Sequence, residues 1–195
     1  MREASIARKT KETDIRLRFC LDGSGKTAID TGVGFFDHML DALCRFGLLD
    51  LELTCRGDLQ VDAHHTVEDC GICLGKALRE ALGDRRGIRR VGSAYLPMDE
   101  ALAFAALDIS GRPCLVFDAA FLAPMCGTMD TQLAEEFFRA LAVNAGLTLH
   151  LKVIEGRNDH HKMEALFKAF GLALRDAAAM DPRVRGVLST KGSLD

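Results

Sequence analysis

Short stretches in which apolar and polar residues alternate recur along the chain, and their period of two predicts β-strands. In the first half, strands are predicted over 4–9, 14–21, 27–31, 48–55 and 58–62. A Gly-containing turn at 22–25 separates the second and third of these, and we expect residues 27–31 to return beside the preceding strand as a hairpin.

Apolar residues spaced by three and four positions predict helices between these strands. One apolar helical face is formed by Phe36, Met39, Leu40 and Leu43. This helix is expected to stop at Gly47, and a later one to run to about Leu82 and to be closed by Gly83, because glycine favours helix ends.

The second half repeats this order. Its predicted strands are 91–97, 101–108, 114–118 and 147–154, and its predicted helices are 130–145 and a final one that ends near Met180, before Pro182. The repeat predicts an internal duplication of the α+β class, in which each half is a mostly antiparallel sheet with helices packed on one face. We divide the chain into halves 1–90 and 91–180 and a polar tail, 181–195.

The strongest chemical signal is a His-His-x-x-Glu motif that occurs once in each half, where a helix is predicted to begin. The two copies are His64, His65 and Glu68, and His160, His161 and Glu164. Residues three or four positions apart share a helix face, so each glutamate can point back toward its histidines. Imidazole nitrogens and a carboxylate suit a borderline divalent metal, and two copies predict two metal ions.

A lone histidine is more often a surface or core residue than a ligand, but four of the six histidines lie in these two motifs. The remaining two are His38, at the start of a predicted helix, and His150, in a predicted strand. Either alone would more often be structural. Together they bring the set to three histidines and one glutamate per metal. The two motifs could meet within one chain or across a subunit interface.

Composition narrows the functional class. With 195 residues, 48% of them hydrophobic and 27% charged, the chain can bury a core. The net charge of -3 argues against a nucleic-acid partner, and no apolar run is long enough for a membrane span. The first residues lack the apolar core of a signal peptide. Seven cysteines without a small-scaffold spacing indicate reduced thiols, and we expect a cytoplasmic protein.

Three short patterns each allow more than one interpretation. The segment 23–27 looks like the end of a phosphate-binding P-loop, but the glycine that this motif requires five residues before Gly25 is Cys20. Cys70 and Cys73 lie one turn apart in a predicted helix, so we expect core packing rather than redox chemistry. The basic segment 85–90 is either a solvated turn or an anion site.

Several segments in the same order resemble the imidazoleglycerol-phosphate dehydratase family, from about Lys9 to Lys191. They include the two His-His-x-x-Glu motifs, and they lie at 35–41, 62–69, 97–102, 108–113 and 160–170. The resemblance implies a duplicated fold like domain 2 of ribosomal protein S5. It also implies a homo-oligomer of 24 subunits built from trimers, with active sites between subunits that each hold two Mn²⁺ ions.

The reaction implied by the resemblance is dehydration of D-erythro-imidazoleglycerol phosphate to imidazole acetol phosphate, in histidine biosynthesis. The ions would act as Lewis acids on the substrate imidazole, and a carboxylate must move a carbon-bound proton. By resemblance, Glu12 is the base and Asp99 lies near the substrate hydroxyls or the metal ligands.

The substrate phosphate needs cations and hydroxyl groups, which the resemblance also supplies. The matching positions are Arg90, Arg112, Lys168, Ser189 (or the neighbouring Thr190) and Lys191. One departure concerns Ala42, because many members of the family carry glutamine there, so a contact to substrate could be missing or replaced.

Two other functions would also use the histidine motifs. A dinuclear metallohydrolase fits the ligands but leaves the segments 37–41 and 108–113 unexplained. A metal-storage protein would not need the cationic residues Arg90, Arg112 and Lys168.

Overall fold

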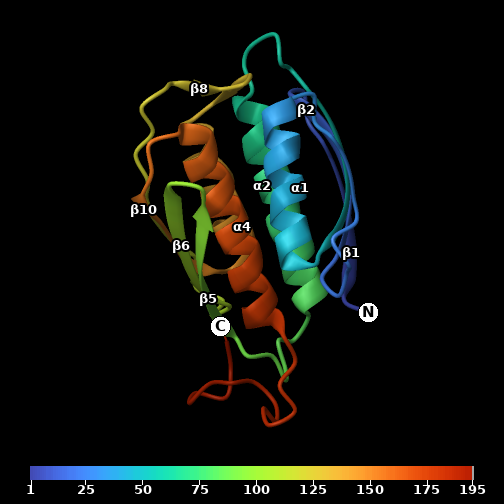
Figure 1. The fold of residues 1–195 in the computed structure, drawn as a ribbon. Coiled ribbons are helices and arrows are strands. Elements are labelled where there is room, and N and C mark those ends of the chain that lie inside the picture. The colour runs from blue at the N-terminus through green and yellow to red at the C-terminus, as the bar shows by residue number, and fades with distance from the viewer. Residues whose placement is uncertain (195) are drawn as a thin grey trace.

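The structure, a computed structural model, describes residues 1–194, which form two four-stranded sheets with helices between them (Figure 1). The strands are β1 (Glu3–Lys9), β2 (Thr13–Cys20), β3 (Thr27–Asp30), β4 (Asp50–Gly57), β5 (Val91–Met98), β6 (Ala101–Asp108), β7 (Cys114–Asp118), β8 (Met125–Cys126), β9 (Met129–Asp130) and β10 (Thr148–Glu155). The helices are α1 (Gly34–Gly47), α2 (His64–Leu82), α3 (Leu133–Ala145) and α4 (Asp159–Ala178). None of these helices combines the length and the apolar character that a membrane crossing requires.

The two sheets have the same topology, which confirms the predicted α+β fold with two similar halves. Their strand orders are β1-β2-β4-β3 and β5-β6-β10-β7. In each sheet two neighbouring pairs are antiparallel and the last pair, β4 with β3 or β10 with β7, is parallel. The division at residue 90 falls in the link between α2 and β5, and residues 181–194 follow α4.

The predicted hairpin between the second and third strands is wrong. Strand β3 pairs with β4 in parallel, and β4 lies between β2 and β3. The turn after β2 is tied to the start of β4 instead, because the Asp50 carboxylate accepts hydrogen bonds from the backbone N–H groups of Ser24 and Lys26, at 2.7 and 2.9 Å. Strand β4 occupies the position beside β2, so β3 pairs on the far side of β4.

Two other predicted boundaries also need correction. Residues 58–62 form a turn rather than a strand, with the Val61 N–H bonded to the Asp58 carbonyl at 2.8 Å and the Val61 side chain exposed. The helix predicted over 130–145 begins at Leu133, because Asp130 still belongs to β9, which pairs with β8.

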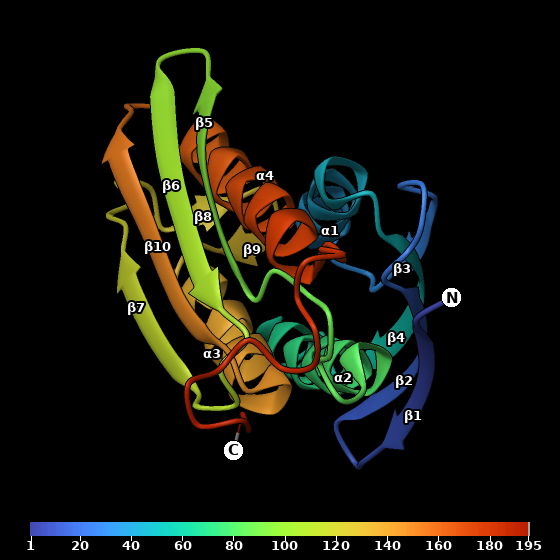
Figure 2. The same cartoon turned by 90° about the horizontal axis from the view of Figure 1, so that it is seen from below.

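The four helices form the interior layers, and α1 packs on α4 while α2 packs on α3 (Figure 2). Glycines at equivalent positions of the two halves permit these close contacts. A Cβ atom at Gly171 of α4 would lie 2.3 Å from the Leu43 carbonyl oxygen of α1, and one at Gly75 of α2 would lie 2.6 Å from the Leu141 carbonyl oxygen of α3. Cys70 and Cys73 are buried on α2, so the prediction of core packing is confirmed.

We expect Gly171→Ala to lower the free energy of unfolding by about 1–3 kcal/mol, because the added methyl group would push α4 away from the α1 backbone. The matched control is Gly34→Ala in the first turn of α1, where a Cβ atom meets nothing within 4 Å. That change should stay within about 0.5 kcal/mol or be stabilising. Urea unfolding of both variants tests this, and equal stabilities would contradict the tight contact.

Candidate active site

Three of the predicted ligands meet where α1 and α4 begin. His38 Nε2 and His160 Nε2 lie 3.1 and 3.0 Å from the same oxygen, Oε2 of Glu164. One ligand atom from each of these residues can be chosen so that all three lie within 4.8 Å of one another. The imidazoles are nearly half exposed, whereas the Glu164 side chain is only 8% exposed. The cluster is therefore a partly open set of two nitrogens and one carboxylate.

The charge of Glu164 is held by its neighbours. Burial raises the pKa of this carboxyl, but the Lys168 ammonium, with its Nζ 2.6 Å from Oε1, and the two imidazoles more than offset that effect, and the net pKa is lowered. Glu164 is thus an ionised carboxylate near neutral pH, which is the form that binds metal.

The first motif is arranged in a similar but looser way. His64 Nε2 lies 3.8 Å from Glu68 Oε2, across the first turn of α2, and both side chains are more than 40% exposed. The helical spacing that the sequence predicted therefore brings each glutamate next to the first histidine of its motif. Both motifs begin their helices at the same end of the molecule (Figure 1).

The second histidine of each motif lies beside two other carboxylates rather than beside the glutamate of the motif. The arrangement is alike in the two halves. His65 Nδ1 lies 3.0 and 3.1 Å from the two Asp58 carboxylate oxygens, and its Nε2 lies 3.8 Å from Glu12 Oε1. His161 Nδ1 lies 2.8 Å from Glu100 Oε2, and its Nε2 lies 3.7 Å from Asp99 Oδ2. Each imidazole is thus held between two carboxylates, one at each ring nitrogen.

These contacts shift the titration of the groups involved. The hydrogen bond from His161, with help from the Asn158 backbone N–H, lowers the pKa of Glu100 to about 2. The partner carboxylates Asp58 and Glu100 raise the pKa of His65 and of His161, respectively, because each stabilises the charged imidazolium.

Sequence reasoning missed Asp58 and Glu100 as members of the site. The sequence pattern placed Asp58 in a short strand, and Glu100 fell only within the segment 97–102 that resembles the family. The available signal was that a histidine ligand usually has a carboxylate or carbonyl on its other ring nitrogen.

Glu12 and Asp99, predicted from the family resemblance to act on substrate, occupy equivalent hairpin tips. Glu12 lies between β1 and β2, and Asp99 lies between β5 and β6, with a left-handed φ of 49°. Both side chains are more than half exposed. The hairpins bring both carboxylates next to the second histidine of the motif in their own half.

A buried carboxylate fastens the Glu12 hairpin to α2. Asp69, directly after the first motif, accepts a hydrogen bond from the Thr13 hydroxyl at 2.5 Å and forms an ion pair with Arg8. The Thr10 hydroxyl oxygen in turn accepts bonds from the backbone N–H groups of Glu12 and Thr13, at 3.1 and 3.0 Å. The position of Glu12 therefore depends on the helix that carries His65.

His150 lies apart from the other predicted ligands. It is exposed on β10, while its neighbours Leu149 and Leu151 are buried on the opposite face, toward the helices. Within residues 1–194, no hydrogen bond or ion pair joins His150 to another predicted ligand. Its role as a ligand stays a prediction.

Most of the predicted phosphate-binding residues line one pocket at the other end of the molecule. Arg90, Arg112, Ser189 and Lys191 line it together with Thr190, and sequence reasoning missed two further cations there, Arg183 and Arg185. The missed signal was the pair of arginines near the start of the tail.

Within this pocket, the Arg90 guanidinium donates two hydrogen bonds to the Asp108 carboxylate, at 2.6 and 2.8 Å, and one to the Leu188 carbonyl. The basic segment 85–90 therefore helps to hold the tail, since Arg85 also donates to the Leu194 carbonyl. The Arg112 guanidinium has no ion-pair partner among the residues that the structure describes.

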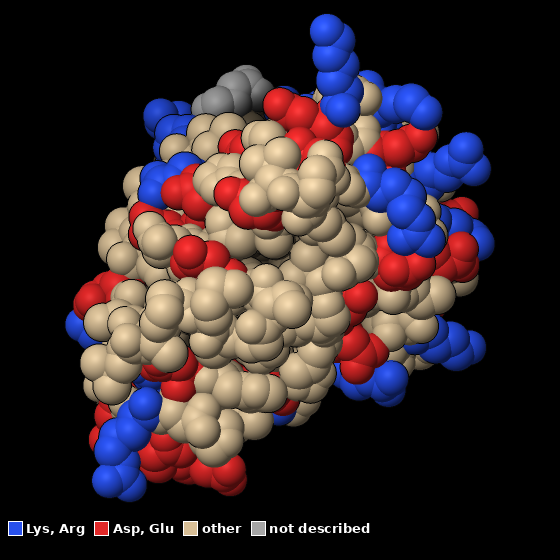
Figure 3. All heavy atoms as spheres, turned by 90° about the horizontal axis from the view of Figure 1, so that it is seen from above, with Lys and Arg blue, Asp and Glu red and all other residues tan. Residues whose placement is uncertain are grey.

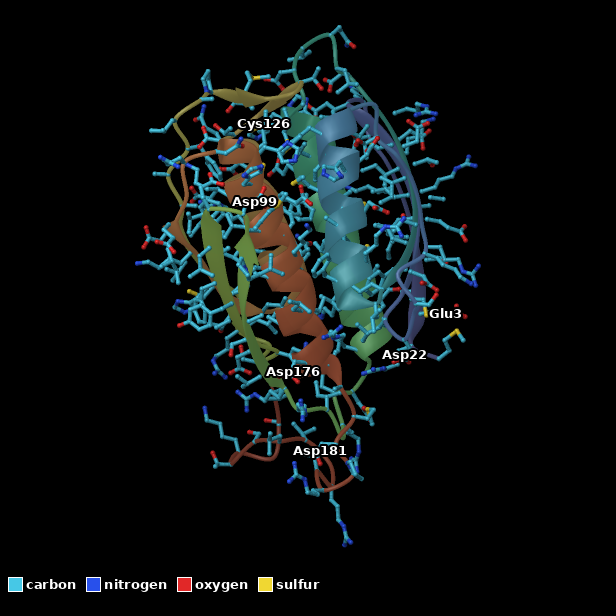
Figure 4. All side chains as sticks on the ribbon, in the orientation of Figure 1. Glu3, Asp22, Asp99, Cys126, Asp176 and Asp181 are labelled. Atoms are coloured by element: carbon cyan, nitrogen blue, oxygen red, sulfur yellow. The ribbon has the colours of Figure 1, made fainter. Side chains whose placement is uncertain are left out.

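The histidine end of the molecule and the cationic pocket are far apart. The Arg90 N–H bonds to the Ala177 carbonyl near the end of α4, 17 residues after His160 near its start. At 1.5 Å per residue, about 25 Å of helix separate them. Figure 4 shows the same separation, with Asp99 near the start of α4 and Asp176 and Asp181 at the opposite end. Looking onto the histidine end, Figure 3 shows red carboxylates scattered over the central face, with Lys and Arg mainly at the rim.

One predicted phosphate-binding residue, and the position where the chain departs from the family, lie away from this pocket. Lys168 lies one turn beyond Glu164 on α4, where its Nζ contacts Glu164 and sits 4.9 Å from the Phe46 ring centroid. Ala42, where glutamine was expected, is buried in α1.

The geometry defines a candidate enzyme site with a histidine and carboxylate end and a cationic end, and comparisons with known proteins identify the family. Residues 31–174 match the family described as Imidazoleglycerol-phosphate dehydratase. The Symbiobacterium thermophilum protein of that name is 65% identical over 193 residues, covering 99% of this chain and 93% of that protein. The Ruminiclostridium cellulolyticum protein is 58% identical over 194 residues, covering all of both.

Solved structures agree. The imidazoleglycerol-phosphate dehydratase from Staphylococcus aureus matches with a TM-score of 0.84 and 41% identity, covering 92% of this chain and 99% of that one. The Pyrococcus furiosus structure matches with a TM-score of 0.83 and 39% identity, covering 97% and 100%. The chain belongs to the imidazoleglycerol-phosphate dehydratase family. Members of this family are hydro-lyases of histidine biosynthesis, so the predicted family and enzyme class are confirmed.

We expect Asp69→Ala to lower the free energy of unfolding by about 1–3 kcal/mol, because it leaves Arg8 and Thr13 without their buried acceptor. Turnover should fall as well, because the Glu12 hairpin loses its tie to α2. The control is Asp14→Ala, which removes the exposed ion pair with Lys9 on the same hairpin and should change stability by less than about 1 kcal/mol. Urea unfolding and steady-state kinetics measure both effects, and an unaltered Asp69→Ala protein would contradict the account.

Proposed function

We propose that this chain is a Mn²⁺-dependent dehydratase that converts D-erythro-imidazoleglycerol phosphate to imidazole acetol phosphate in histidine biosynthesis, with two Mn²⁺ ions per active site. The observation that carries the proposal is the pairing of two histidine and carboxylate clusters, at the starts of α2 and α4, with a separate cationic pocket formed by the tail. The family to which the chain belongs supports the same reaction.

The residues present suit such a metal. The cluster of His38, His160 and Glu164 offers two imidazole nitrogens and one ionised carboxylate within 4.8 Å of one another. Mn²⁺ accepts this combination of nitrogen and oxygen ligands. His64, His65, Glu68, His161 and His150 would complete the two ligand sets. Bound there, the ions would supply Lewis acidity to the imidazole of the substrate.

The remaining residues would position the substrate and move its proton. Glu12 lies on a hairpin tip that is tied to α2 through Thr10, Thr13 and Asp69, and its carboxylate would take the carbon-bound proton. Asp99, on the equivalent tip in the second half, would contact the substrate hydroxyls. The phosphate would be bound by Arg90, Arg112, Ser189, Lys191 and Lys168.

These parts suit one active site only if different subunits contribute to it. The histidine end and the cationic pocket of a single chain are separated by about 25 Å of α4. Three carbon atoms join the imidazole and the phosphate of the proposed substrate, and such a molecule cannot span that distance. We therefore propose active sites between subunits of a homo-oligomer, a particle of 24 chains built from trimers, with His150 contributed by a neighbouring chain.

The competing functions are less well supported. A metallohydrolase does not agree with membership of a hydro-lyase family. A storage protein has no use for Arg112, a cation without an ion-pair partner in the described chain. We also propose a cytoplasmic location, which the free state of all seven cysteines supports, and no nucleic-acid or membrane partner.

The test is turnover of imidazoleglycerol phosphate by protein stripped with a chelator and titrated with Mn²⁺. Product should appear only as the metal is restored. A rate of product formation that does not depend on added Mn²⁺ would contradict the proposal. The absence of product from a folded and metal-loaded oligomer would also contradict it.

Arg112→Ala separates the enzyme from a storage protein. The loss of one charge-assisted phosphate contact should raise KM by roughly 10–100-fold and leave Mn²⁺ binding unchanged. Arg112 suits this test better than Lys168, because Lys168 also contacts the proposed ligand Glu164. Arg16→Ala, an exposed arginine on β2, is the control and should leave both properties unaltered. An unchanged KM in Arg112→Ala would remove Arg112 from the phosphate site.

A further inference from the structure

Two carboxylates outside the proposed ligand set each face the Nδ1 atom of a proposed ligand. Asp58 lies 3.0 Å from His65 Nδ1, and Glu100 lies 2.8 Å from His161 Nδ1. We propose that Asp58 and Glu100 are positioning residues that keep the proton of each imidazole on Nδ1 and direct the unprotonated Nε2 to the metal. This inference rests on the proposed function.

The chemical reason is the choice between two tautomers. A neutral imidazole carries one proton, and the nitrogen that lacks it is the metal ligand. A carboxylate accepts hydrogen bonds but cannot donate one, so it holds the proton on the nitrogen that it faces. With Nδ1 protonated, the lone pair of Nε2 is available on the side where Glu12 or Asp99 lies, 3.8 and 3.7 Å away. Such partners orient metal ligands in many proteins.

The two carboxylates come from different parts of the duplicated fold. Asp58 lies in the loop between β4 and α2, whereas Glu100 lies in the turn between β5 and β6. The two halves thus reach the same arrangement at Nδ1 from different elements. Duplication of the sequence alone does not explain this likeness. A need for a hydrogen-bond acceptor at Nδ1 of the second histidine in each motif does explain it.

The oxygen atoms of Glu100 have separate partners. Oε1 accepts from the backbone N–H groups of Arg157 and Asn158, at 3.1 and 2.7 Å, and Oε2 faces His161 Nδ1. In Glu100→Gln, the two backbone donors would keep the amide oxygen at the Oε1 position. The amide NH₂ would then face Nδ1, which would have to accept, and the imidazole proton would move to Nε2. The variant keeps the shape of the site but blocks the metal-binding nitrogen.

The surroundings of Asp58 differ from those of Glu100, so the corresponding amide substitution is expected to have the opposite effect on the imidazole tautomer. Both of its carboxylate oxygens lie near Nδ1, at 3.0 and 3.1 Å, and no backbone N–H donates to either of them among residues 1–194. In Asp58→Asn the amide is free to turn its carbonyl oxygen toward Nδ1, so the tautomer is preserved. Asp58→Ala removes the acceptor altogether.

The experiment measures Mn²⁺ affinity by electron paramagnetic resonance of the free ion, using chelator-stripped, refilled full-length protein. Glu100→Gln should weaken binding by about 10–100-fold, and Asp58→Ala by about 10-fold, as expected for the loss of an outer partner. Asp58→Asn should stay within about 3-fold of wild type, because its carbonyl replaces the lost acceptor. Glu155→Gln, an exposed change at the end of β10, is the matched control and should have no effect.

The outcomes separate the inference from the proposed function. Wild-type affinity in both Glu100→Gln and Asp58→Ala would overturn the inference. A loss in Asp58→Asn equal to that in Glu100→Gln would also overturn it, because it would show that charge rather than tautomer matters. Failure of the wild-type protein to bind Mn²⁺ would overturn the proposed function itself. Thermal unfolding of the metal-free proteins identifies a variant that is merely misfolded. If a variant at one of the two carboxylates is misfolded, the variants at the other carboxylate test the inference.

Discussion

The close approach of α4 to α1 determines where the proposed ligands meet. His38 belongs to α1, whereas His160 and Glu164 belong to α4, so their contact exists only while the two helices pack with this spacing. Gly171 permits the contact, because a Cβ atom there would lie 2.3 Å from the Leu43 carbonyl oxygen. The glycine at the equivalent position of α2, Gly75, has the same role against α3. The two helices that carry the motifs, α2 and α4, also begin at a common end of the molecule (Figure 1).

Carboxylates then set the chemistry of that end. Glu164 is almost buried but remains ionised, since Lys168 and two imidazoles surround it. Asp58 and Glu100 hold two further imidazoles by Nδ1, and Asp69 holds the hairpin that bears Glu12. The cations of the tail gather at the opposite end, around Arg112. The histidine and carboxylate cluster and the cations of the tail thus lie at opposite ends of α4. One small substrate can contact both only if a neighbouring chain supplies one of them, as the proposed mechanism requires.

Local patterns predicted the elements and many of the close pairs, whereas contacts between distant segments escaped them. The helical spacing in each motif brought Glu68 to His64 and Glu164 to His160. The pairing of β3 with β4 was missed, because alternation reveals a strand but not its neighbour. The hydrogen bond that the Asp50 carboxylate accepts from Ser24 joins distant segments and leaves no periodic pattern in the sequence. Glu12 was chosen only through the family resemblance, because an exposed acid in a hairpin turn carries no signal of its own. Asp58 and Glu100 depend on loop geometry that no spacing rule describes.

In the proposed oligomer, the histidine end of one chain and the cationic end of another form one active site. The most direct measurement mixes two damaged chains, His160→Ala and Arg112→Ala, co-expressed with different tags and purified on both. A site is intact when its histidine end comes from an Arg112→Ala chain and its cationic end from a His160→Ala chain. Random mixing should produce this combination in about a quarter of the sites, so kcat/KM should recover to about a quarter of wild type. If each site belonged to one chain, the mixed oligomers would show no more than the residual activity of Arg112→Ala alone, and that result would contradict the account.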